Sequence, residues 1–153
     1  MCRSLLYLLA FCSFLVACND HLKIEANNNP PGYADSQVVG AWKITALSSN
    51  TAYDWDGNGT TETDIFKTWS ECDKDHLFNF NGNKTGVYKI NCSTTVNGVW
   101  QIFNTEQFEY TPEGMSTLAE KIIAMTSNEF KTTRTITVTS GQIFTLTKTW
   151  TRQ

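Results

Sequence analysis

Histidine is scarce in this sequence, and the usual ingredients of an enzyme active site are scarce with it. The chain has two histidines, His21 and His76, too few and too far apart to build a zinc site. The nucleophile motif Gly-x-Ser-x-Gly is absent, and so is a glycine-rich phosphate-binding loop. Carboxylates crowd residues 54–75, where metal binding or solvation explains them better than glycoside hydrolysis. We therefore expect a protein that is not an enzyme.

Positive charge is also in short supply. Lysine and arginine number 12 against 15 aspartates and glutamates, which gives a formal net charge of −3. Nucleic-acid-binding surfaces are normally basic, so we expect no nucleic acid partner. No basic stripe provides an electrostatic attachment to an anionic membrane surface either.

No apolar run is long enough to cross a bilayer, which takes about 20 residues. The longest run extends from Leu5 to Val16, after a single positive charge, and the small residue Ala17 then precedes Cys18. This order is typical of a signal peptide, predicted here over residues 1–17. The alternative is an ordinary secreted protein in which the cysteine is incidental.

The Ala17-Cys18 pair resembles the lipobox of bacterial lipoproteins. In that family the thiol is acylated, the chain is cut before the cysteine, and the new amine is acylated too. The resemblance implies that Cys18 is lipidated and anchors the protein to a membrane, stably because more than one acyl chain is attached. Residues 18–37 have little apolar content and are expected to form a flexible tether. Residues 38–153 are the predicted folded domain.

Two cysteines remain after processing, Cys72 and Cys92. Because the envelope is oxidising, this isolated pair predicts a disulfide; a pair of free buried thiols is the alternative. A hairpin whose tip is 81–83 would place the two cysteines opposite each other and Asp75 opposite Lys89. Its even-numbered residues would then face the core.

From Val38 onward, β-branched and aromatic residues alternate with polar ones, and Asn-Gly and Ser-Gly pairs recur. The pattern predicts strands joined by short turns, which favours an antiparallel meander. Eight strands are predicted, over residues 38–48, 72–81, 84–96, 99–104, 106–111, 120–126, 129–139 and 142–152. A helical turn is expected within 62–70, and residues 113–121 are open to a helix. The predicted core consists of Trp42, Phe78, Phe80, Tyr88, Trp100, Ile102, Phe144, Leu146 and Trp150.

One stretch of the acidic region has the spacing of an EF-hand calcium loop. Residues that can offer oxygen ligands alternate along it, and a glycine stands sixth, where the loop must bend. The candidate ligands are Asp54, Asp56, Asn58, Thr60, Glu62 and Asp64. Position twelve is Ile65 rather than glutamate, so Asp64 could substitute only if the loop closes differently. A structural calcium ion is one interpretation, and a solvated turn rich in Asp, Asn and Gly is the other.

The first predicted strand contains Gly40 and Trp42, and this Gly-x-Trp resembles the lipocalin signature. In lipocalins the tryptophan packs at the closed end of a barrel under an arginine from the last strand, a position that Arg152 matches. With the lipobox, tether and acidic loop, residues 18–153 are similar to lipocalin-like lipoproteins of the Bacteroidota. The resemblance implies an all-β, antiparallel, up-and-down eight-stranded barrel. It also implies an outer-membrane location, on a face that the sequence leaves open.

Two functions follow from these patterns. The first is an envelope-anchored, non-enzymatic protein that binds a small hydrophobic ligand in the barrel. The second is a structural or interaction module with a filled barrel, which contacts a partner protein or a glycan complex at the cell surface. Loop aromatics such as Tyr53, Trp55 and Trp69 would serve the second function. A cavity above about 300 Å³ would favour the first.

Overall fold

The structure is a computed structural model that describes residues 32–90 and 92–153. The predicted signal peptide, Cys18 and the tether up to residue 31 lie outside the described residues. The end of the predicted tether is wrong, because it belongs to the folded domain: the Tyr33 N–H donates to the Thr105 carbonyl at 2.7 Å, and Asp35–Val38 form a helical turn. The chain divides into two units, Met1–Pro30 and Pro31–Gln153, and the second contains every described strand. Because this unit has its own hydrophobic core, it can fold independently. Within the described part, no helix combines the length and hydropathy that crossing a membrane requires.

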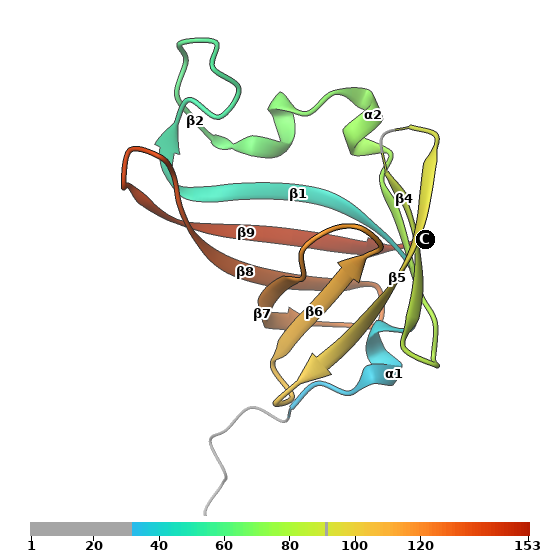
Figure 1. Ribbon diagram of the computed structural model, residues 1–153. Helices are drawn as coiled ribbons and strands as arrows, with labels where there is room; N and C mark the ends of the chain where they lie inside the picture. Colours follow the sequence, from blue (N-terminus) through green and yellow to red (C-terminus); the bar gives the residue numbers. More distant parts are fainter. Residues whose placement is uncertain (1–31, 91) are drawn as a thin grey trace, which may run out of the picture. The chain divides into compact units, whose positions relative to one another are not determined.

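The described strands confirm the predicted fold class, a closed antiparallel barrel of eight strands (Figure 1). Consecutive strands pair around the ring, and β1 pairs with both β3 and the last strand, β9, which closes it. The barrel strands are β1 (Gly40–Tyr53), β3 (Leu77–Phe80), β4 (Thr85–Ile90), β5 (Thr94–Phe103), β6 (Gln107–Pro112), β7 (Leu118–Met125), β8 (Glu129–Thr137) and β9 (Ile143–Arg152). The short strand β2 (Glu62–Asp64) pairs with the second half of β1, outside the ring.

Three short helical segments accompany the strands: α1 (Asp35–Val38), the 3₁₀-helix η1 (Ile65–Thr68) and α2 (Glu71–Lys74). The helical turn expected within 62–70 is thus present as η1. A helix within 113–121 is wrong, because Leu118 begins β7. Leu118, Glu120 and Ile122 are less exposed than the residues between them, and this period-two burial decides against the local helix propensity.

The β3–β4 hairpin pairs two residues further along than predicted, with Phe78 opposite Tyr88. The cause is the position of the turn: its three loop residues are 82–84 rather than 81–83, because the Asn81 N–H donates to the Thr85 carbonyl at 2.9 Å. The Lys84 N–H donates to the Asn81 carbonyl at 3.1 Å, and Lys84 has a φ of 69°, as in three-residue hairpin loops that end in a left-handed residue. Since a two-residue shift keeps every side chain on its face, the predicted core face is still correct.

The predicted disulfide between Cys72 and Cys92 is confirmed, with 4.8 Å between the two Cα atoms. The predicted strand over 72–81 is wrong in its first half, however, because Cys72 lies in α2. Ser70 caps this helical turn by accepting a hydrogen bond from the Asp73 N–H at 3.2 Å, which is a standard way to begin a helix. The bridge therefore fastens α2 to the end of β4 rather than joining two paired strands.

Lys89 still pairs with Asp75, at 2.5 Å, although Asp75 precedes β3 instead of lying on it. Lys43 on β1 binds the other carboxylate oxygen at 2.6 Å. Hydrogen bonds from the two ammonium groups lower the pKa of Asp75 to about 2. This partly exposed carboxylate thus connects β1 and β4 across the start of β3.

The predicted strands 84–96 and 99–104 are also wrong in their boundaries. The strand β4 ends at Ile90 and β5 begins at Thr94, and β5 runs without a break through the Asn-Gly pair that suggested a turn. Gly98 faces Gly86 across the β4–β5 ladder. A Cβ atom at Gly98 would collide with the Tyr88 ring and the Thr111 carbonyl oxygen. Because Gly98 has no side chain, the Tyr88 ring can pack directly over its backbone.

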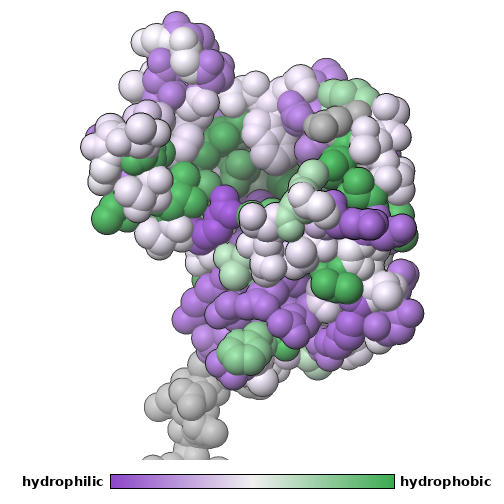
Figure 2. Space-filling model, viewed as in Figure 1, coloured by the Kyte–Doolittle hydropathy of each residue, from purple (hydrophilic) through white to green (hydrophobic). Residues whose placement is uncertain are grey.

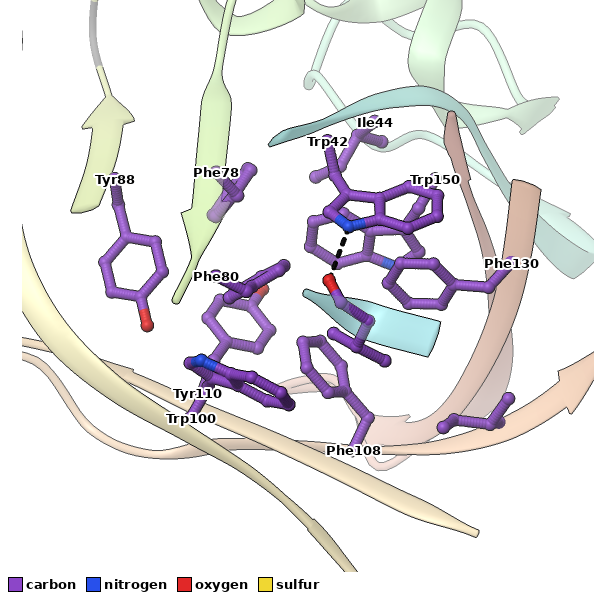
Figure 3. Close-up of a cluster of buried hydrophobic side chains, with 12 residues drawn as sticks. Trp42, Ile44, Phe78, Phe80, Tyr88, Trp100, Phe108, Tyr110, Phe130 and Trp150 are labelled. Atoms are coloured by element: carbon purple, nitrogen blue, oxygen red, sulfur yellow. Dashed lines mark hydrogen bonds between the residues drawn. The ribbon is translucent and has the colours of Figure 1, made fainter. Parts of the chain in front are cut away.

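A cluster of inward-facing aromatic side chains fills part of the barrel (Figure 3). Their rings meet mostly edge to face or tilted, as aromatic pairs prefer; Trp42 meets Phe130 at 4.8 Å between centroids. The cluster comprises Trp42, Phe78, Phe80, Tyr88, Trp100, Phe108, Tyr110, Phe130 and Trp150.

Seven of the nine predicted core residues are buried, whereas Ile102 and Leu146 are half-buried. Phe108, Tyr110 and Phe130 were missed, although each lies on the inward face of a predicted strand.

We predict that Gly98→Ala lowers the free energy of unfolding by about 2 kcal/mol, because the added methyl group overpacks the space beneath Tyr88. Gly82→Ala is the matched control, since a Cβ at Gly82 meets no atom within 4 Å, and it should change stability by less than about 0.5 kcal/mol. Urea unfolding followed by tryptophan fluorescence measures both. Equal stabilities would show that the contact between the ring and the glycine is not tight.

Candidate functional site

Beside the aromatic cluster, whose Phe78 and Tyr110 contribute to its wall, the barrel contains a partly open cavity of about 260 Å³. Its walls are mainly apolar and come from several strands: Ile44 and Leu47 on β1, Ile90 on β4, Leu118 on β7 and Leu146 on β9. Apolar surface is visible within a hollow of the domain in Figure 2. The barrel is therefore filled in one part and open in another.

Two connecting segments add residues to this cavity. Trp69 and His76 come from the stretch between η1 and β3, and Met115 comes from the loop between β6 and β7. Burial lowers the pKa of His76, although Asp73, 3.7 Å from its Nε2 atom, acts in the opposite direction. At neutral pH the imidazole is therefore uncharged and forms part of a largely apolar wall.

A buried polar cluster lies among the cavity walls. The Lys148 ammonium forms an ion pair with Glu120, whose side chain is 3% exposed. The Thr132 hydroxyl donates to the other carboxylate oxygen of Glu120, and the Trp150 indole N–H donates to Thr132 at 3.1 Å. Lys148 also donates to the Tyr110 hydroxyl at 3.3 Å. These bonds satisfy the groups that burial would otherwise leave unpaired.

The charges of this polar cluster compensate one another. Burial raises the pKa of the Tyr110 hydroxyl, which keeps it neutral at physiological pH. Burial would lower the pKa of Lys148, but Tyr110 and Glu120 outweigh it and the pKa is raised. Lys148 therefore stays cationic and is matched by the carboxylate of Glu120.

Gly40, Trp42 and Arg152 come together where β1 begins and β9 ends. The Arg152 guanidinium lies 4.2 Å from the centroid of the Trp42 ring, and it donates to two carbonyl oxygens before β1 at 2.7 and 2.9 Å. Gly40 has a φ of 133°, and a Cβ atom there would meet the guanidinium. The guanidinium and the Trp42 ring thus form a cation–π interaction. None of the three residues lines the cavity.

The candidate calcium ligands lie in the loop between β1 and β2 and on β2, but they are engaged with the loop's own backbone. Asp54 accepts hydrogen bonds from the N–H groups of Asn58 and Gly59, both at 2.9 Å. Asp56 also accepts from the Asn58 N–H, at 3.2 Å. Asn58 accepts from the Thr60 N–H at 2.8 Å. Such bonds are typical of Asx turns.

The last two candidate ligands have other partners. Glu62 accepts a hydrogen bond from the Trp55 N–H at 3.0 Å, and Asp64 pairs with Lys67 at 3.2 Å. Nowhere in the described ranges do three or more acidic, histidine or cysteine side chains group as a metal ion would require. Calcium binding at this loop stays a prediction from the spacing alone.

That prediction is tested by calorimetry with Ca²⁺. Binding heat is expected for the unchanged protein and should be lost when Asp54 and Asp56 are both changed to Ala, because calcium needs six to eight oxygen ligands. Glu71→Ala is the control, since this exposed carboxylate lies outside the loop. Absence of heat with the unchanged protein would leave the loop as a solvated turn.

Comparison with known proteins gives the chain a family. Residues 25–149 match the family described as "Domain of unknown function (DUF5004)". The chain belongs to the DUF5004 family. A search of the curated proteins found no match for it.

Solved structures with some likeness to this DUF5004 chain are bovine odorant binding proteins. The complex of one with its natural ligand has 13% identity and a TM-score of 0.45, covering 81% of this chain and 76% of that chain. The complex with undecanal has 14% identity and a TM-score of 0.43, with the same coverages. Likenesses this distant carry no argument about function, and the barrel is established by its own strand pairing.

Sequence reasoning missed the polar residues of the cavity. Glu120 and Lys148 were not singled out, yet each occupies an alternate position between apolar residues that face inward. Glu120 stands between Leu118 and Ile122, and Lys148 between Leu146 and Trp150. A charged residue on the apolar face of a strand is the signal that could have found them.

Proposed function

We propose that this DUF5004 domain is a non-enzymatic binding protein that holds a small, largely apolar molecule in the open part of its barrel. The cavity of about 260 Å³ carries the proposal, because eight-stranded barrels either fill with side chains or hold one small ligand. Its volume falls short of the expected threshold of about 300 Å³, the lower end of the range for ligand pockets, so the proposal rests on the cavity's apolar lining rather than on its size. A compact ligand is therefore expected.

The alternative, an interaction module with a filled barrel, is less well supported. The loop aromatics that would serve it are used inside the domain. The rings of Tyr53 and Trp55 pack against buried Phe144, at 5.1 and 5.0 Å between centroids, and Trp69 lines the cavity. These contacts favour ligand binding over a surface that presents aromatic residues to a partner protein or glycan.

Filling the cavity should abolish binding. We predict that Leu146→Trp weakens binding of the neutral fluorescent probe N-phenyl-1-naphthylamine at least about tenfold, a loss of about 1.4 kcal/mol, because the indole occupies the volume that the probe needs. Ile143→Trp, on the same strand but 67% exposed, should bind the probe as the unchanged protein does. Fluorescence titration measures both.

Thermal unfolding accompanies the titration and shows that both variants are folded. Unchanged probe affinity in folded Leu146→Trp would mean that the probe binds elsewhere. Failure of the unchanged protein to bind any apolar probe would favour the interaction module.

We further propose that the mature protein is a lipoprotein of the cell envelope, anchored at the outer membrane through Cys18. The signal-peptide pattern and lipobox support this proposal, as does the disulfide, since such bonds persist in oxidising compartments. Kinship with lipocalin-like lipoproteins of the Bacteroidota belongs to the same proposal. A tethered barrel could then meet its ligand, or an envelope protein partner, close to the membrane.

Changing Cys18 to Ser should prevent lipidation, because the acyl chains then have no attachment point. In cells that produce the full chain, the processed protein should move from the membrane pellet to the soluble fraction, or the chain should stay uncleaved. Cys12→Ser is the matched control, since this cysteine lies within the predicted signal peptide and should leave fractionation unchanged. Tight membrane binding of processed Cys18→Ser protein would contradict the anchor.

A further inference from the structure

Arg134 brings an unneutralised charge to the cavity. It follows buried Thr132 by two positions on β8, so it lies on the inward face of that strand, and it lines the cavity. Within residues 32–90 and 92–153, no hydrogen bond or ion pair engages its guanidinium. Arg134 is half-buried, and with no partner among these residues its guanidinium is available to bind a ligand.

The strand pairing explains why Arg134 has no partner among these residues. The ladder between β7 and β8 ends at Lys121 opposite Thr133. Continuing it by one step would place Glu120 opposite Arg134. Instead, Glu120 is bound to Lys148 and Thr132, and the strands are not paired beyond this point. The carboxylate nearest along the ladder is thus already occupied.

Arg134 also lies between two different environments. A second hollow, of about 550 Å³, shares Glu120 and Arg134 with the apolar cavity. Its other walls are mostly polar and include Glu106 and Lys121, which form an ion pair with each other at 3.2 Å. Where the β7–β8 ladder stops, Arg134 therefore lines both a largely apolar cavity and a mostly polar one.

The remaining titratable groups around the cavity do not cancel this charge. Glu120 and Lys148 compensate each other. Tyr110 and His76 are neutral at physiological pH, because burial raises the pKa of the first and lowers the pKa of the second. The cavity therefore keeps one net positive charge, on Arg134.

We propose that the ligand is a single-chain amphiphile with an anionic head. Its carboxylate binds the Arg134 guanidinium, and its alkyl chain fills the apolar cavity beside Leu118 and Leu146. A guanidinium can hold a carboxylate through two parallel hydrogen bonds, which are stronger than bonds between neutral groups. This inference rests on the proposed function and names the chemistry of the ligand.

The test compares three ligands with the same chain length: decanoate, decanol and decyltrimethylammonium. Each displaces N-phenyl-1-naphthylamine from the unit Pro31–Gln153, which contains the whole barrel. We expect decanoate to bind about tenfold more tightly than decanol, as charge-assisted hydrogen bonds allow, and the cation to bind most weakly. Equal affinities for decanoate and decanol would overturn the proposal.

Variants of Arg134 then assign the preference to its side chain. Arg134→Gln should remove the preference for decanoate, so that decanoate and decanol bind with similar affinities, and thermal unfolding shows that the variant is folded. Arg134→Lys should keep part of the preference, because the charge remains but the forked geometry is lost. Lys131→Gln is the matched control, since Lys131 is a cation on the same strand that does not line the cavity. A preference that survives Arg134→Gln would contradict the proposal.

Failure of the proposed function gives a different result from failure of this inference. If neither the probe nor decanol binds the unchanged domain, the barrel does not bind apolar ligands, and both the proposed function and the anionic-head proposal are contradicted. If both bind but decanoate has no advantage, only the anionic head is wrong. Decyl phosphate in place of decanoate distinguishes a phosphate head from a carboxylate head, and a tighter phosphate complex would overturn the carboxylate assignment.

Discussion

The pairing of β1 with β9 is the interaction on which the rest of the structure depends, because it turns a meander into a ring. The register shifts between Ile44 and Ala46, where β1 contains an extra residue. Trp42 and Ile44 face inward before this irregularity, and Leu47 faces inward after it. Without the shift, strict alternation would direct Leu47 outward, and the cavity would lose part of its wall. A bulge of this kind re-aims a side chain while the ring stays closed.

The interior of the barrel has an aromatic part and a part that contains charged side chains. Aromatic rings fill one part of the barrel and make up most of its buried hydrophobic cluster. The other part holds a buried ion pair, which brings little net stability after desolvation. Glu120 and Lys148 are nevertheless well hydrogen-bonded, and their compensation makes the charge of Arg134 distinctive. Stability and ligand choice thus come from separate sets of side chains within one barrel.

Period-two alternation predicted the inward faces well, because burial on one face of a strand is a strong local signal. Turn chemistry misled at two places: Gly98 makes room for the Tyr88 ring rather than forming a turn, and the β3–β4 turn, with left-handed Lys84, lies one residue later than expected. The cysteine pairing was right although the register was wrong. The cavity could not be predicted, since its volume depends on side chains from many strands. Arg134 gives no sign in the sequence that its charge is unpaired.

The strand β2 has one free edge among the described strands, because it lies outside the closed ring. It is three residues long and bears Glu62 and Asp64. Short, charged edges resist pairing with strands of other molecules. These two carboxylates therefore act as a barrier to aggregation. Many copies of this domain could therefore be crowded together without joining into a continuous sheet.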